Sequence, residues 1–98
     1  MSELDPVIHA QARLRVVAAL STLGDGDHIA FPRLQDLLQM TAGNLSVHLR
    51  KLEEAGYITI DKSFLGRKPL TQARLTLAGR AAFARWLQAI GSLVDGRG

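Results

Sequence analysis

The sequence contains no cysteine in its 98 residues. This absence excludes a disulfide framework, an iron–sulfur cluster, a thiolate zinc site and a cysteine nucleophile. Long apolar runs are also missing, because the longest one spans only Val16–Leu20 and the chain opens with the acidic stretch Met1–Pro6. Such a pattern encodes neither a secretion signal nor a membrane-spanning segment. We therefore expect a cytoplasmic protein without a membrane partner.

Residues that support enzyme chemistry are scarce as well. The three histidines, His9, His28 and His48, lie 19 and 20 positions apart and have no paired acid at metal-ligand spacing. The sequence has neither a glycine-rich phosphate loop nor a nucleophile elbow. We therefore predict a protein that is not an enzyme and has no metal site and no cofactor.

Length and composition indicate one folded domain over residues 1–98. Hydrophobic residues make up 47% of the chain and charged residues 21%, which is typical of a globular protein. The net charge of +3 is unevenly distributed: residues 1–43 have a net charge of −2, whereas residues 44–98 hold nine Lys and Arg against four acidic residues. This asymmetry gives modest support to a surface that meets a polyanion such as nucleic acid.

Capping residues and apolar periodicity predict the helices, and a two-residue period predicts the strands. Asp5 suits an N-cap and Pro6 the first helical position, so a first helix should run to about Leu23. Thr41 is an N-cap candidate and Gly56 a C-terminal stop for a later helix. The expected elements are a helix over 6–23, a strand over 28–30, helices over 31–38 and 42–55, strands over 57–64 and 70–75, and a helix over 77–94.

Two of these helices are separated by only about three residues, which is helix-turn-helix spacing. Each has leucines at intervals that place them on one side of a helix, and that side must face the core. The expected inner residues are Leu34, Leu37 and Leu38 in the first helix, and Leu45, Leu49 and Leu52 in the second.

The order helix, strand, helix, helix, strand, strand, helix predicts a mainly α protein with a small β-hairpin, a winged helix-turn-helix. Thr41–Ile58 resembles the recognition-helix segment of small transcriptional regulators of the MarR and ArsR types. Phe64–Pro69, followed by Leu75–Arg80, resembles the wing and the cap of the final helix in those regulators. The resemblance covers nearly the whole chain, although Gln39 stands where a turn glycine is common. It implies a dimeric DNA-binding regulator whose first and last helices form the dimer interface.

The side of the helix over 42–55 that lies opposite the leucines carries residue types that contact DNA. Asparagine pairs with adenine, arginine with guanine and valine with a thymine methyl group, while serine and lysine suit phosphates. No acid precedes Glu53 in this helix, which favours DNA binding over a passive solvated face. A packed, hydrogen-bonded boundary position is an equal alternative for the histidine. The expected contacts are Thr41, Gly43, Asn44, Ser46, Val47, His48, Arg50 and Lys51.

Arg67 and Lys68 are expected at the tip of the hairpin, between a glycine that allows the turn and a proline that stiffens the return. Most isolated basic turns are merely solvated. Beside a recognition helix, however, we favour binding of this tip to the DNA backbone or minor groove. Lys62 and Arg74 add phosphate contacts only if they project to the same side, which the sequence leaves open.

The first and last helices both carry more apolar surface than one small domain easily buries, which predicts a symmetric homodimer. Two recognition helices would then lie about 34 Å apart and fit a pseudo-palindromic operator in double-stranded DNA. A repressor that acts by steric occlusion is favoured, since no separate activating domain is apparent. In the last helix the apolar stripe consists of Phe83, Trp86, Leu87, Ile90, Leu93 and Val94.

Two other functions stay open. Winged helices also serve as protein-interaction modules without DNA binding, and the same polar side of the helix over 42–55 could meet an acidic protein. The resemblance to the MarR type also suggests a small-molecule effector in a crevice between the dimer helices and the winged helix. No residue in the sequence identifies such a ligand.

Overall fold

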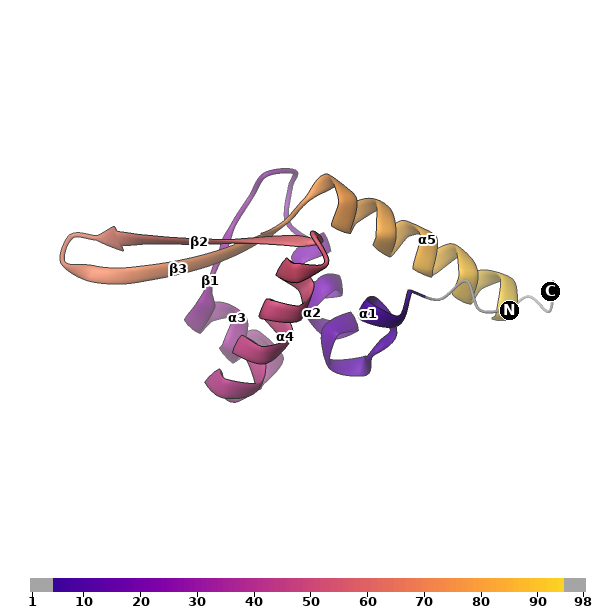
Figure 1. The fold of residues 1–98 in the computed structure, drawn as a ribbon, viewed down its shortest axis with the longest axis horizontal. Coiled ribbons are helices and arrows are strands. Elements are labelled where there is room, and N and C mark those ends of the chain that lie inside the picture. Colours follow the sequence, from indigo (N-terminus) through magenta and orange to yellow (C-terminus); the bar gives the residue numbers. More distant parts are fainter. Residues whose placement is uncertain (1–4, 95–98) are drawn as a thin grey trace.

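The computed structural model describes residues 5–94, and Figure 1 shows how their helices and strands are arranged. The element order is the predicted one, except that two helices replace the first. The elements are α1 (Pro6–His9), α2 (Gln11–Ser21), β1 (Ile29–Ala30), α3 (Phe31–Leu38), α4 (Ala42–Glu54), β2 (Ile58–Leu65), β3 (Lys68–Leu75) and α5 (Leu77–Val94).

The prediction of one continuous first helix is wrong, because the chain breaks between α1 and α2. Ala10 has an extended backbone (φ −61°, ψ 127°), and Nε of Arg13 closes the break by donating to the carbonyl oxygen of Val7 at 2.6 Å. On a continuous helix Ile8 and Val17 would point about 180° apart. Both side chains are fully buried, so the break allows two otherwise opposite sides to meet one core.

The predicted N-cap of α1 is confirmed. Asp5 Oδ1 accepts a hydrogen bond from the backbone N–H of Val7 at 2.9 Å. The Tyr57 hydroxyl donates to the second carboxylate oxygen, Oδ2 of Asp5, and this bond ties α1 to the residue that precedes β2. The hydrogen bond to the carboxylate raises the pKa of Tyr57, and burial of the phenol raises it further.

The leucine side of α4 faces the core, as predicted: Leu45, Leu49 and Leu52 are at most 2% exposed. The prediction that Leu37 is buried is wrong. Its side chain is 60% exposed, because the neighbouring Leu34 and Leu38 lie nearly above one another on α3 and fill the side that packs against the core. The other buried apolar residues are Ile8, Val16, Val17, Leu20, Ile58, Ala73, Leu75, Ala82 and Trp86.

The turn between α3 and α4 shows how glutamine takes a position where glycine is common. Gln39 adopts the left-handed conformation (φ 54°, ψ 45°), which is unfavourable for a residue with a side chain. Its Nε2 donates to the carbonyl oxygen of Asp36 at 2.8 Å. Arg15 of α2 donates to the carbonyl oxygen of Leu38 at 2.5 Å, which fixes the end of α3. Thr41 then caps α4, as predicted.

The three strands form an antiparallel sheet in the order β1-β3-β2. The hairpin is longer than predicted, because the expected break over 65–69 shrinks to a two-residue turn at Gly66 and Arg67. Pro69 is tolerated inside β3 because β1 pairs only with Gln72 and Ala73, which leaves the edge of β3 open at the proline. The backbone N–H that proline lacks is not needed at an open edge.

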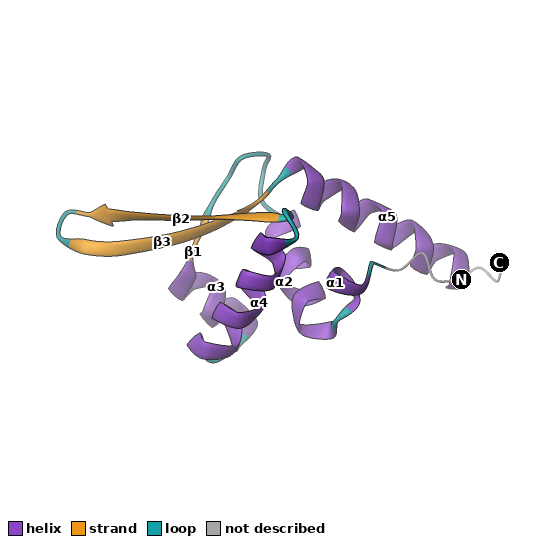
Figure 2. Cartoon of the chain, viewed as in Figure 1, coloured by secondary structure: helices purple, strands orange, loops and turns teal. Residues whose placement is uncertain are grey.

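Thr76 caps α5, as predicted, by accepting a hydrogen bond from the backbone N–H of Gly79 at 3.0 Å. One turn later the Arg80 guanidinium donates to the carbonyl oxygens of Ser21 and Leu23 at 3.4 and 3.3 Å, which holds α5 against the end of α2. Figure 2 shows that the hairpin of β2 and β3 extends from one end of the helical body, while the far end of α5 extends in the opposite direction.

Candidate nucleic-acid interface

The side of α4 that faces away from the leucines is open to solvent along its length. Thr41 is also exposed, and its hydroxyl accepts from the backbone N–H of Asn44 at 3.1 Å. Among residues 5–94, neither Arg50 nor Lys51 takes part in an ion pair, so both cations are available to a ligand. We call this surface the α4 face, and its residues are Gly43, Asn44, Ser46, Val47, Arg50 and Lys51.

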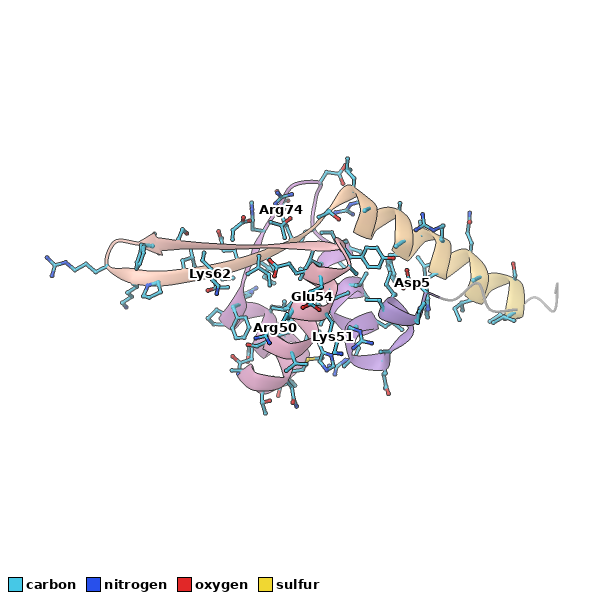
Figure 3. The ribbon with its side chains drawn as sticks, viewed as in Figure 1. Asp5, Arg50, Lys51, Glu54, Lys62 and Arg74 are labelled. Carbon is cyan, nitrogen blue, oxygen red and sulfur yellow. The ribbon has the colours of Figure 1, made fainter. Side chains whose placement is uncertain are left out.

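A groove of about 470 Å³ separates α4 from the hairpin. Ser46 and Arg50 line it on the α4 side, and Lys62 and Thr71 line it on the hairpin side. Figure 3 shows Arg50 and Lys62 on the same side of the hairpin, the side on which α3 and α4 lie. Glu53 supplies a carboxylate to the lining. The groove therefore continues the α4 face onto the hairpin and has a cationic side chain on each wall.

Strand alternation places Lys62 and Arg74 on opposite sides of the sheet, a point that the sequence left open. Lys62 pairs with Thr71 and shares its side of the sheet with Ile60, so it lies over the groove. Arg74 points to the other side, where its Nε lies 3.8 Å from a carboxylate oxygen of Asp61. Lys62 therefore belongs with the α4 face and Arg74 does not. The signal was available in the sequence, because Lys62 is two positions after Ile60 and has the same parity.

The two basic residues predicted at the tip of the hairpin, Arg67 and Lys68, occupy different positions there. Arg67 is exposed in the turn itself, where Gly66 supplies the positive φ of 65°. Lys68 is the first residue of β3 and pairs with Leu65, so alternation places it on the sheet side opposite to Lys62. The structure thus brings Arg67 to the outer end of the wing and does not bring Lys68 onto the groove side.

His48 lies at the boundary between the leucines and the α4 face. Its ring is partly exposed, while Nδ1 is buried and has no hydrogen-bond partner among residues 5–94. Burial lowers the pKa of His48 below its ordinary value, and the positive charges of Arg13 and Lys51 lower it further. His48 is therefore partly packed against the core, and its Nδ1 lacks the hydrogen bond that the packed alternative included.

The lowered pKa of His48 predicts a pH dependence of folding. Because the unfolded chain keeps the ordinary pKa of 6.5, it binds the proton more tightly than the folded chain does. The contribution of His48 to the unfolding free energy should thus decline as the pH falls through 6.5 and be lost fully below the folded-state pKa. Urea denaturation at several pH values between 7.5 and 5 checks this, with His48→Gln as the comparison. An equal decline in the variant would contradict it.

Residues 12–94 match the family model described as a winged helix DNA-binding domain. The chain belongs to this family. An uncharacterised protein of Methanocaldococcus jannaschii is 32% identical over 84 residues, which cover 86% of this chain and 88% of the relative. The match to the family model runs from the second residue of α2 to the last residue of α5, so it includes both helices of the helix-turn-helix and the hairpin.

Solved structures share the fold of this winged helix protein. A transcriptional regulator homologue from Pyrococcus horikoshii OT3 superposes with a TM-score of 0.82 at 28% identity, over 92% of this chain and 86% of that one. MepR of Staphylococcus aureus, solved in complex with DNA, superposes with a TM-score of 0.77 at 17% identity, over 96% of this chain and 74% of that one. A MarR-family regulator is also a neighbour. The predicted winged helix-turn-helix fold and its MarR-like architecture are confirmed.

The winged helix family and fold are those of DNA-binding transcriptional regulators and not of enzymes, as predicted. Within residues 5–94, no three His, Cys, Asp or Glu side chains are grouped so that they could hold a metal ion. In the same part of the chain, no helix combines the length and the apolar character that crossing a bilayer requires.

Proposed function

We propose that this winged helix protein recognises a specific double-stranded DNA sequence as a homodimer and represses transcription by covering its operator. The observation that carries the proposal is the continuity of the α4 face with the groove beneath the hairpin. Arg50 on one wall and Lys62 on the other are free of ion pairs among the described residues. A surface of this kind matches a major groove flanked by phosphates.

Individual side chains of the α4 face suit defined parts of the duplex. Asn44 can pair with the edge of adenine, Arg50 with guanine, and Val47 can contact a thymine methyl group. Ser46 and Lys51 suit phosphates, and the N-terminus of α4 adds backbone N–H groups that favour anions. Small residues at the start of α4 permit close approach of the DNA. At Gly43, for example, no other atom lies within 4 Å of the point where a Cβ atom would be.

The homodimer is supported by apolar surface that the single chain leaves uncovered. Beyond Trp86, no residue of α5 up to Val94 is buried, although this part of the helix is mostly apolar. Leu87 and Leu93 are 51% and 64% exposed. A second copy that covers this stripe would remove apolar area from water and would also pair two α4 faces by a twofold axis.

A fluorescence anisotropy titration tests DNA binding against the alternative of a protein-interaction module. The labelled probe is random duplex DNA, and the titration is done at about 50 and about 200 mM salt. Between these concentrations, proteins that make several phosphate contacts lose about 10³-fold or more in affinity. Binding that weakens steeply with salt supports the proposal. Absence of binding even at the lower salt concentration would favour the protein-interaction module.

Arg50→Ala and Lys62→Ala should weaken DNA binding in different ways. Loss of Arg50 removes a base contact, so it should cost about 1–3 kcal/mol on the preferred sequence and relax the preference at one base pair. Loss of Lys62 removes a phosphate contact, so it should weaken binding to all sequences and reduce the salt slope by about one. Anisotropy with preferred and random duplexes measures both. Arg74→Ala is the matched control and should change neither quantity, and equal losses in all three variants would contradict these roles.

A further inference from the structure

The wing carries two large apolar side chains that its own fold does not cover. Phe64 and Leu65 are each 72% exposed, next to the turn that ends β2. Both lie at the end of β2, beyond the residues of the hairpin that pair with or lie opposite β1. A partner that covered either side chain would remove apolar area from water, which favours binding.

Strand register places these two side chains on opposite sides of the hairpin. Phe64 pairs with Pro69, which lines a continuation of the same groove, of about 340 Å³, together with Ser46 of α4 and Lys62 of β2. Leu65 pairs with Lys68 on the other side. Phe64 therefore lies on the side of the wing that continues the α4 face, and Leu65 does not.

The charge around Phe64 indicates what covers it. The hairpin from Lys62 to Leu75 contains no acidic residue, while Lys62 and Arg67 lie within three positions of the phenyl ring in sequence. An apolar protein partner would have to bury these cations, at a high cost in desolvation. A polyanion that presents both phosphates and stacked apolar surface satisfies the cations and the ring together. Duplex DNA is such a partner.

We propose that Phe64 acts as an apolar wedge that enters the minor groove beside the base pairs contacted by α4, partly unstacks one base step and bends the duplex. Apolar side chains inserted in this way kink DNA by about 20–90° towards the major groove, and nearby cations hold the phosphates on both sides. Lys62 and Arg67 have that role here. The inference rests on the proposed function, because the wing meets a minor groove only if α4 binds the adjoining major groove.

The test compares Phe64→Ala with Leu65→Ala, two truncations of neighbouring residues with equal exposure. The probe is a short duplex that the full chain selects from a random pool. End-to-end energy transfer between terminal dyes reports the bend, and 2-aminopurine placed at successive flanking positions reports unstacking. Wild-type protein should bend the duplex and raise 2-aminopurine fluorescence at one step. Phe64→Ala should lose both signals and bind about tenfold more weakly, whereas Leu65→Ala should keep them.

Phe64→Leu is a second comparison, because leucine is also an effective wedge and should keep most of the bend. Tight binding by the wild-type chain without a bend, or equal signals from Phe64→Ala and Leu65→Ala, would overturn the wedge and leave the proposed function standing. Failure of the wild-type chain to bind any duplex would instead overturn the proposed function, and the wedge with it.

Discussion

Gly79→Ala should destabilise the folded protein by about 3 kcal/mol, as expected for severe overpacking in a well-packed region. A Cβ atom at this position would lie 2.0 Å from the backbone oxygen of Tyr57 and 2.9 Å from its carbonyl carbon. The same oxygen accepts a hydrogen bond from the backbone N–H of Thr76 at 3.0 Å. Since backbone groups and not a flexible side chain meet the methyl group, α5 would have to move away from the start of β2.

Denaturant unfolding at a fixed protein concentration measures the effect of Gly79→Ala. Gly43→Ala is the control, because Gly43 is also helical but has open space around it. Alanine has the higher helix propensity, so this control should be neutral or stabilising by up to about 1 kcal/mol. A small effect of Gly79→Ala, similar to that of the control, would show that α5 does not pack against Tyr57 as described.

Leu87→Glu combined with Leu93→Glu should convert the proposed dimer to a monomer and weaken binding to a complete operator by about 100-fold or more, because the second half-site is then no longer bound at high effective concentration. Both leucines are more than half exposed in the single chain, so the folded protomer should survive the change. Two carboxylates on each copy would be desolvated without partners in the interface. Binding to a single half-site should stay the same.

Analytical ultracentrifugation and anisotropy with full and half operators measure these effects. The control is Gln88→Glu combined with Ser92→Glu, which adds the same charge to exposed positions on another side of α5. The control should remain a dimer with normal affinity. A leucine variant that stays dimeric, or a wild-type chain that is monomeric at operator-binding concentrations, would contradict the proposed dimer interface.

The parts of the fold that follow local rules could be predicted from the sequence. The leucine period of α4 defines its buried side directly, and the caps Asp5, Thr41 and Thr76 form the predicted hydrogen bonds at three helix starts. The exposure of the α4 face follows from the same period, since residues opposite a buried seam must face outward. The buried side, the caps and the exposed face all depend on sequence intervals within a single helix, so their prediction needs no knowledge of the neighbouring elements.

The parts that depend on contacts between elements could not be predicted. The break at Ala10 has no proline or glycine to mark it, and it exists because Ile8 and Val17 are drawn into one core. Leu37 is exposed because α3 is short and only one narrow side of it meets the core. The position of Lys62 across the groove from Arg50 depends on how the hairpin packs against α4, which alternation within β2 does not define.

The central claim is that the α4 face and the groove side of the hairpin form one DNA-binding surface. An NMR titration of isotope-labelled protein with a duplex selected from random DNA tests this claim most directly. The largest shifts of backbone amide signals should fall within residues 43–51 and 62–71, with little change around Arg74 and Arg80. Shifts concentrated on other elements, with the signals of α4 unmoved, would contradict it.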